Sequence, residues 1–130
     1  MIVVDASVIA TALGDDDDDG DRARARLRGE QLAAPYLLDA EVASVLRRQV
    51  SSGQLPPRRA RLALDDLITM PLRRAPHIPL LSRAWELREN LTIYDALYVA
   101  LAEALDVRLL TADAPLSRVR RLRCTVELLN

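Results

Sequence analysis

The sequence contains no lysine, one histidine and one cysteine, and these shortages exclude several kinds of site. With a single cysteine, Cys124, no intrachain disulfide can form, so the composition suits a reducing compartment. One cysteine and one histidine, His77, do not provide the ligands of a structural zinc site. All 18 basic residues are therefore arginine, whose planar side chain binds phosphate through paired hydrogen bonds. Biased genome composition explains this excess of arginine better than phosphate binding does.

Long apolar runs are also absent. No stretch approaches the roughly 20 residues that span a bilayer, and the chain reaches Asp5 without a basic leader, so no secretory signal is expected. Half of the residues are hydrophobic, which is enough for the core of one domain. The net charge of −1 does not mark the chain as a general binder of polyanions. We expect a single cytoplasmic domain over residues 1–130 that does not contact a membrane.

Short apolar runs alternate with longer helix-like segments along the chain. The expected strands are residues 2–4, 32–34, 72–75, 107–110 and 124–126. The expected helices are residues 6–13, 21–28, 38–50, 56–68, 79–87 and 93–105, with a short turn of helix after Asp113. This alternation predicts a three-layer α/β/α domain with a short central parallel sheet. The acidic run Asp15–Asp19 is expected to be a loop because it is bounded by glycines and its like charges repel.

Four acids stand at positions where a charge is costly. Asp5 directly follows the first expected strand and Asp113 follows the fourth, and functional groups of parallel sheets gather beyond the carboxyl ends of strands. Glu41 and Asp95 lie in apolar stretches of two expected helices, where an unpaired carboxylate is unfavourable. Two carboxylates about 4 Å apart repel by about 4 kcal/mol at an effective dielectric near 20. If the four converge, they require a cation, and their oxygen ligands suit Mg²⁺ or Mn²⁺.

Structural roles explain three of these acids equally well when each is taken alone. Asp95 stands three residues after Thr92 and can complete a capping box. Asp113 can cap a short helix, and Glu41 can face solvent near the start of its helix. Asp5 is harder to explain in this way, because a charged end to the first buried strand indicates a site. Capping and metal binding are also compatible, since a capping carboxylate still presents an oxygen.

Four segments that carry these acids resemble the motifs of PIN-domain proteins. They are Ile2–Ser7, Leu38–Arg48, Thr92–Ala102 and Leu109–Asp113. The third segment is specific, whereas the first and fourth are weak alone. The order, spacing and total length are similar to those of VapC toxins of VapBC toxin–antitoxin pairs, over nearly the whole chain. The resemblance implies a PIN fold and a magnesium-dependent endoribonuclease that hydrolyses phosphodiester bonds in RNA and in which Mn²⁺ can replace Mg²⁺.

The resemblance also implies roles for individual residues and partners. It assigns the catalytic metal site to the same four acids: Asp5, Glu41, Asp95 and Asp113. Ser7 and Thr111 match polar positions that support the acids or metal-bound water. Some family members carry another acid where this chain has Leu116, so the number of metal ions, one or two, stays open. The implied partners are a second copy of the chain and a cognate VapB-like antitoxin, which we expect to cross the helices 38–50 and 56–68 and place an arginine against the acids.

Three other classes compete with this interpretation. A phosphoryl-transfer domain of the receiver or haloacid type also has an aspartate after its first strand. Such domains normally use a lysine, which this chain lacks, and Asp5 has no second acid two residues later. A PIN-fold interaction module without catalysis is disfavoured because all four acids are present. A nuclease that acts on DNA is not excluded, because a carboxylate–magnesium site suits both nucleic acids.

Structural roles are expected for most of the remaining distinctive residues. His77 is interpreted as structural, and Trp85 as part of the core or of a dimer contact. Cys124 is placed on the last strand, with no neighbouring base that would make it a catalytic thiol. The arginine pairs 47–48 and 73–74 can contact phosphate, although surface solubility explains them equally well.

Overall fold

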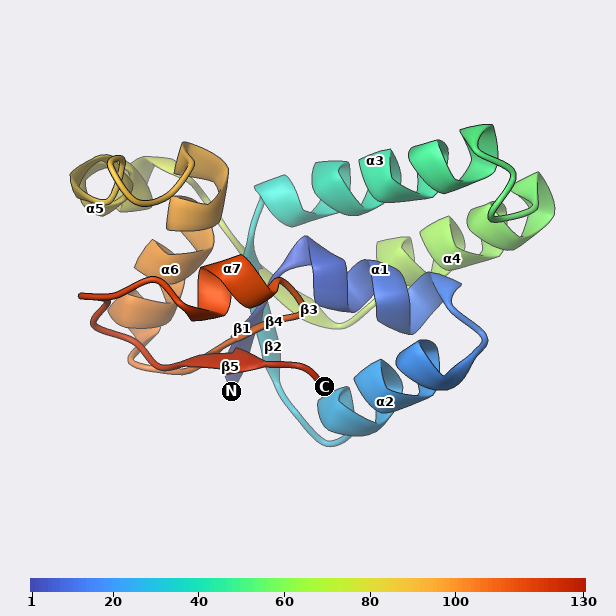
Figure 1. Ribbon diagram of the computed structural model, residues 1–130, viewed down its shortest axis with the longest axis horizontal. Helices are drawn as coiled ribbons and strands as arrows, with labels where there is room; N and C mark the ends of the chain where they lie inside the picture. The colour runs from blue at the N-terminus through green and yellow to red at the C-terminus, as the bar shows by residue number, and fades with distance from the viewer.

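Five parallel strands form the centre of the computed structural model, which describes residues 1–130. The sheet order is β3-β2-β1-β4-β5. The strands are β1 (Ile2–Val4), β2 (Leu32–Pro35), β3 (Leu72–Ala75), β4 (Leu109–Thr111) and β5 (Val126–Leu128). Helices cover both sides of this sheet (Figure 1). The predicted α/β/α architecture with a central parallel sheet is therefore confirmed.

The helices pack in two groups on opposite sides of the sheet. They are α1 (Ala6–Gly14), α2 (Asp18–Leu27), α3 (Leu37–Ser51), α4 (Pro57–Thr69), the 3₁₀ turn η1 (Ile78–Leu80), α5 (Leu81–Glu86), α6 (Ile93–Leu105) and α7 (Ala114–Ser117). Figure 1 shows α1, α2 and α4 on one side and α5 and α6 on the other. None of these helices combines the length and the apolar character that a bilayer crossing requires.

Burial on both faces explains the composition of the central strands. All residues of β1 and β4 are buried, and β1 pairs with β2 on one edge and with β4 on the other. A strand that is covered on both faces has no solvent side, so its sequence is a continuous apolar run rather than an alternation. The helix α6 is buried from Ala96 to Ala102 and contacts β1 and β2. These buried elements hold the carboxyl ends of β1 and β4 in place, and the candidate site lies at those ends.

The strand order creates a crevice at the carboxyl end of the sheet. From the central strand β1, the chain adds β2 and β3 on one side and β4 and β5 on the other. The connections therefore leave β1 and β4 in opposite directions. In open parallel sheets, such a point is where ligands bind.

The predicted boundaries were wrong at the last two strands. The fourth strand begins at Leu109, because Asp106 adopts a left-handed conformation with φ of 55° that ends α6, and Val107 is still bonded to the last turn. The fifth strand is Val126–Leu128, in register with β4, so Cys124 precedes it rather than lying on it. Strand pairing, which local sequence does not reveal, sets both limits.

The acidic run is only partly a loop. Asp18 and Asp19 already belong to the first turn of α2, so the predicted helix start at Asp21 was wrong. Negative charges in a first turn are stabilised by the helix dipole, which offsets their mutual repulsion. The carboxylate of Asp15 accepts hydrogen bonds from the backbone N–H groups of Asp17 at 2.7 Å and Gly20 at 3.2 Å.

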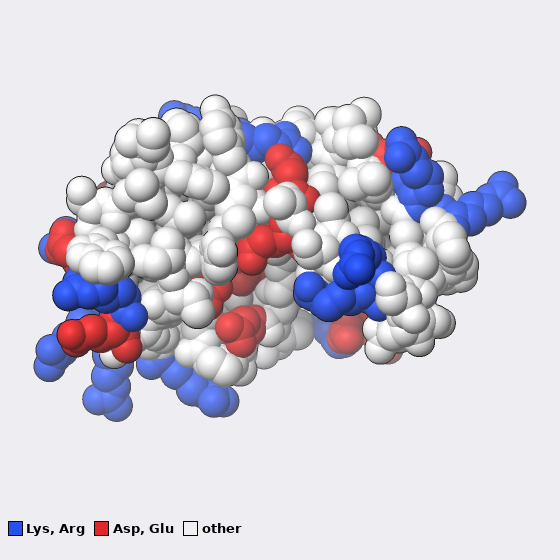
Figure 2. Space-filling view, turned by 90° about the horizontal axis from the view of Figure 1, so that it is seen from above, with Lys and Arg blue, Asp and Glu red and all other residues white.

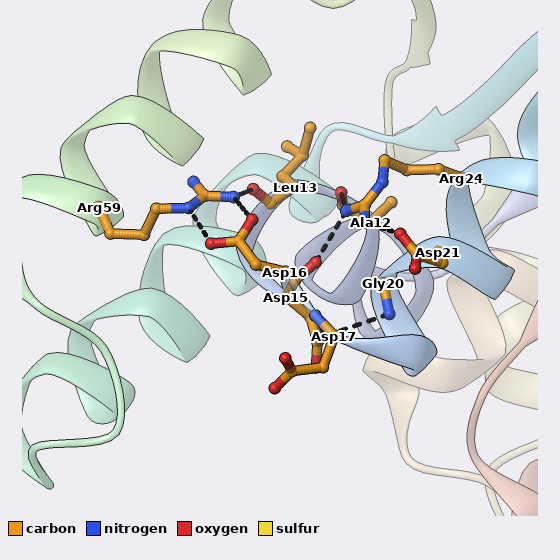
Figure 3. A network of polar contacts seen from close by, with 9 residues as sticks. All are labelled: Ala12, Leu13, Asp15, Asp16, Asp17, Gly20, Asp21, Arg24 and Arg59. Carbon is orange, nitrogen blue, oxygen red and sulfur yellow. Dashed lines mark hydrogen bonds and ion pairs between the residues drawn. The ribbon is translucent and has the colours of Figure 1, made fainter.

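Two arginines bind the chain around this run (Figure 3). Arg59 of α4 pairs with the carboxylate of Asp16 at 2.9 and 3.0 Å and donates to the carbonyl of Leu13 at 2.8 Å. Arg24 of α2 donates to the carbonyls of Ala12 and Asp15, each at 2.8 Å. Because these carbonyls lie at the C-terminal end of α1, the two guanidinium groups satisfy acceptors that the helix leaves unpaired.

His77 has the structural role predicted for it, whereas Trp85 does not lie in the core. Nε2 of His77 accepts a hydrogen bond of 2.9 Å from the backbone N–H of Leu37, so its structural role is confirmed. Trp85 is 61% exposed, which rules out a place in the core of the single chain. The guanidinium of Arg88 lies over the ring of Trp85, 4.7 Å from its centre. The predicted helix 79–87 is divided into η1 and α5, which ends at Glu86.

Candidate active site

The structure brings all four predicted acids to one cavity of about 480 Å³ at the carboxyl ends of β1 and β4. Asp5 follows β1, Glu41 belongs to α3, Asp95 lies in the first turn of α6, and Asp113 precedes α7. Acidic side chains gather in the middle of the face seen in Figure 2, with arginine side chains beside them. Four separate elements therefore supply one concentration of negative charge.

Asp5 is the most buried of these acids, with 8% of its surface exposed. Its Oδ1 accepts hydrogen bonds from the hydroxyl of Ser7 and from the backbone N–H of Val8, and its Oδ2 accepts one from the hydroxyl of Thr111. Burial raises the pKa of the Asp5 carboxyl, although these hydrogen bonds favour the charged form and oppose the shift. The carboxylate also caps α1 through its bond to Val8.

Ser7 and Thr111 connect Asp5 to the segment that carries Asp113. The Ser7 hydroxyl accepts a hydrogen bond of 3.1 Å from the backbone N–H of Ala112. The hydroxyl of Thr111, which is fully buried, accepts one of 3.0 Å from the N–H of Asp113. Both hydroxyls thus donate to Asp5 and accept from the Asp113 segment, so they hold the two acids in a fixed relation.

Glu41 has a partner that the sequence analysis missed. The hydroxyl of Tyr98 donates a hydrogen bond of 2.6 Å to Oε1 of Glu41. Burial raises the pKa of the Glu41 carboxyl, the bond from Tyr98 opposes this shift, and the charges of Asp95 and Asp5 add to it. Burial and the nearby carboxylates also raise the pKa of Tyr98, so this hydroxyl stays a neutral donor. The available signal was a tyrosine within a very apolar helix, since a buried hydroxyl requires a partner.

Capping accounts for only part of the roles of Asp95 and Asp113. The Thr92 hydroxyl accepts a hydrogen bond of 3.1 Å from the backbone N–H of Asp95, as in one half of a capping box. Burial raises the pKa of the Asp95 carboxyl, and the charges of Asp113 and Asp5 raise it further. The carboxylate of Asp113 makes no capping hydrogen bond to α7. Both carboxyl groups therefore remain available to the cavity.

The donor set fits a hard divalent cation in its chemistry. All four acids offer oxygen ligands, and none of them belongs to any arginine–carboxylate ion pair of the structure. No three acidic, histidine or cysteine side chains are arranged to hold a metal ion together. The carboxylates of Asp5 and Glu41 point toward their own hydrogen-bond donors, and like charges are more stable apart when no cation lies between them. The cavity supplies the ligands of a metal site rather than its finished geometry.

Comparison with known proteins agrees with this arrangement. Residues 2–122 match the sequence profile of the PIN domain. Ribonuclease VapC1 of Mycobacterium tuberculosis is 45% identical over 127 residues, which cover 97% of this chain and 96% of the relative. Ribonuclease VapC9 of the same organism is 42% identical over 126 residues, with coverages of 97% and 96%. The chain belongs to the PIN-domain family and, within it, to the VapC group, as the sequence resemblance indicated.

Solved structures share the fold at much lower sequence identity. The crystal structure of Mycobacterium tuberculosis VapC20, described as a toxin that cleaves the sarcin–ricin loop, superposes with a TM-score of 0.71 at 17% identity. The match covers 96% of this chain and 99% of that chain. VapBC2 from Rickettsia felis, bound to a DNA fragment from its promoter, superposes with a TM-score of 0.70 at 16% identity, and both chains are covered completely. These similarities support the fold alone.

Proposed function

We propose that the protein is a magnesium-dependent endoribonuclease toxin that hydrolyses phosphodiester bonds in RNA and is neutralised by a cognate antitoxin. The observation that carries the proposal is the convergence of Asp5, Glu41, Asp95 and Asp113 on one cavity, where none of the four forms an ion pair with an arginine. The relatives named ribonuclease VapC support the same activity. We place this activity in the cytoplasm, where RNA is accessible and where a lone cysteine stays reduced.

The side chains of the cavity have distinct roles in this proposal. The four carboxylates would hold Mg²⁺ or Mn²⁺, which supplies an activated water and stabilises the charge that develops on the phosphate. Ser7 and Thr111 orient Asp5 through their hydroxyl groups. Tyr98 orients Glu41. Asp5 is the least accessible acid and the one most constrained by neighbours, so we assign it the most fixed position around the cation.

Cleavage of single-stranded RNA by the purified protein tests the proposal. We expect cleavage with Mg²⁺ or Mn²⁺ and none in EDTA. Asp5→Asn should abolish cleavage while the circular dichroism spectrum is preserved. Glu89→Gln is the matched control, because Glu89 is exposed, lies outside the cavity and loses the same charge. Full activity in EDTA or in Asp5→Asn would show that these acids are not the metal site.

The same assay separates two competing functions. A PIN-fold module without catalysis would bind RNA and leave it intact whether Mg²⁺ or Mn²⁺ is added. A nuclease for DNA would cleave single-stranded DNA of the same sequence faster than the RNA. We favour RNA because the relatives are named ribonucleases.

A groove between α3 and α4 supports the proposed binding of an antitoxin. This cavity of about 350 Å³ has mainly apolar walls, including Leu46, Val50 and Leu64. An antitoxin segment with apolar side chains fits such walls, and an arginine at its end would pair with the four acids. A chain of a toxin–antitoxin complex from Klebsiella pneumoniae has a related fold, with a TM-score of 0.60. Antitoxin that binds an Asp5→Asn, Asp95→Asn double variant as tightly as the unaltered protein would contradict the arginine contact.

Exposed apolar side chains on η1 and α5 support the proposed homodimer. Ile78, Leu81 and Trp85 are 82%, 45% and 61% exposed. These positions are spaced by three and four residues along consecutive helical turns, so they can share one face. Exposed apolar patches often mark interfaces. We expect light scattering to give the mass of two chains, and Trp85→Glu to give the mass of one. Leu62→Glu on α4 is the control, since Leu62 is 54% exposed but lies on another helix.

A further inference from the structure

Arg48 is a free cation at the edge of the acidic cavity. It lies in the last turn of α3, seven residues after Glu41, and lines the same cavity as the four acids. At a rise of 1.5 Å per residue, the two residues are separated by about 10 Å along the helix. The Arg48 side chain is exposed and forms no ion pair within the protein. Its guanidinium is therefore available to a ligand in the cavity.

Tyr94 presents an aromatic ring to the same cavity. It lies in the first turn of α6, directly before Asp95, and is 61% exposed. The ring does not stack on another aromatic side chain; the aromatic pair of the structure is formed by Tyr36 and His77. An exposed ring beside a phosphodiester-cleaving site offers a face for an unstacked base.

We propose that Arg48 and Tyr94 form a subsite for single-stranded RNA, in which Arg48 binds a phosphate and Tyr94 stacks on a base. The proposal rests on the ribonuclease function proposed above. Four carboxylates repel a polyanion, so a fixed cation at the cavity edge offsets part of that repulsion. Because Arg48 lies two helical turns from Glu41, we assign it to a phosphate beside the one that is cleaved.

Arg47, the residue directly before Arg48 in α3, provides a matched control. Arg47 is also exposed, but it lines the groove between α3 and α4 rather than the acidic cavity. Replacing either arginine by glutamine removes one positive charge from neighbouring positions of α3. A general electrostatic effect on RNA binding would be the same for both variants, whereas a subsite requires Arg48 alone.

The test measures RNA binding in an Asp95→Asn background, in which the RNA stays intact, as checked on a denaturing gel. Fluorescence anisotropy with a short labelled single-stranded RNA of mixed sequence gives the Kd at several salt concentrations. Arg48→Gln should weaken binding about tenfold and reduce the slope of log K against log salt by about 0.7, the value for one lost phosphate contact on a single strand. Tyr94→Leu should weaken binding about tenfold without changing this slope. Arg47→Gln should change neither.

Three outcomes overturn the subsite. Equal losses in Arg47→Gln and Arg48→Gln indicate diffuse electrostatics. Unchanged affinity in Arg48→Gln or Tyr94→Leu removes that residue from RNA binding. A lower melting temperature with unchanged affinity gives Arg48 a structural role at the end of its helix. RNA cleavage is measured separately, with Asp95 intact. Failure of the proposed ribonuclease function would appear as absence of cleavage there, whereas failure of the subsite would appear only in the binding measurements.

Discussion

The hydroxyl of Tyr98 donates a hydrogen bond of 2.6 Å to Oε1 of Glu41, which joins α6 to α3 across the candidate site. Tyr98 is 1% exposed, so its ring is fixed by the core, whereas Glu41 is only half-buried. The bond thus transfers the rigidity of α6 to a carboxylate that would otherwise rotate freely. It also favours the charged form of Glu41, whose pKa is raised by burial.

Removing this hydroxyl group should reduce activity while the protein stays folded. In Tyr98→Phe the ring still fills its place, but Glu41 loses its donor. We expect kcat/KM for RNA cleavage to fall about tenfold or more, as for other groups that orient metal ligands. The free energy of unfolding should fall by only about 1–2 kcal/mol. Tyr36→Phe is the control because Tyr36 is 57% exposed and lies outside the cavity. Equal activities of the two variants would show that Glu41 needs no such support.

Gly20 should be intolerant of alanine, although it lies in a helix. Alanine normally stabilises a helix by about 1 kcal/mol relative to glycine. Here an added Cβ would lie 1.8 Å from the backbone oxygen of Asp15, because the acidic run folds back on the start of α2. We expect Gly20→Ala to lower the free energy of unfolding by about 1–3 kcal/mol in urea denaturation. In Gly14→Ala the nearest atom is the flexible Cδ2 of Leu46 at 3.4 Å, so that variant should change stability little.

Arg83 and Glu103 form the most enclosed ion pair of the protein. The guanidinium of Arg83 binds both carboxylate oxygens, at 2.6 and 3.1 Å, and the Glu103 side chain is 7% exposed. Burial opposes ionisation of Glu103, but its bonds from Arg83 and from the N–H of Arg123 outweigh this and lower its pKa. Arg83→Met should therefore cost about 3 kcal/mol at neutral pH.

The pH dependence of the Arg83→Met variant follows from the sign of this shift. A carboxyl whose pKa is lowered on folding stabilises the protein above its ordinary pKa of 4.5 and loses that contribution as the pH falls. The stability difference between Arg83→Met and the unaltered protein should therefore shrink below about pH 4.5. Arg61→Met is the control, because the Arg61–Asp65 pair is exposed and should contribute less than about 1 kcal/mol. A pH-independent difference would assign the effect of Arg83 to packing.

Continuous apolar runs in the sequence predicted both the sheet and the site. Buried parallel strands are continuous apolar runs, and an acid directly after such a run, as Asp5 is after β1, is conspicuous. An acid within an apolar stretch of a helix, as Glu41 is in α3, is conspicuous for the same reason. Long-range pairing was not predictable: it places β5 at Val126–Leu128 and brings Tyr98 to Glu41. The start of α2 was missed because the contacts of Asp15 and Asp16 with Gly20 and the distant Arg59 are invisible in a local charge run.

Asp95 is the acid best suited to test whether the site is electrostatically strained. Asp5 accepts three hydrogen bonds, which its replacement by asparagine would disturb. The pKa of the Asp95 carboxyl is raised by burial and by the charges of Asp113 and Asp5. A carboxyl with a raised pKa stabilises the folded protein below its ordinary value of 3.8 and loses that contribution as the pH rises through the raised value. At neutral pH the ionised carboxylate therefore destabilises the fold.

Asp95→Asn should raise the melting temperature at pH 7 in EDTA, and this gain should disappear at a pH below 3.8, where the Asp95 carboxyl is already protonated. Mg²⁺ should stabilise the unaltered protein by linkage and stabilise Asp95→Asn less, because one proposed ligand is lost. Glu89→Gln changes the charge by the same amount at an exposed position. Its melting temperatures in EDTA and in Mg²⁺ should therefore equal those of the unaltered protein under the same conditions. Differential scanning calorimetry measures all three proteins. Melting temperatures that respond neither to Asp95→Asn nor to Mg²⁺ would mean that the carboxylates of this cavity do not act as one site.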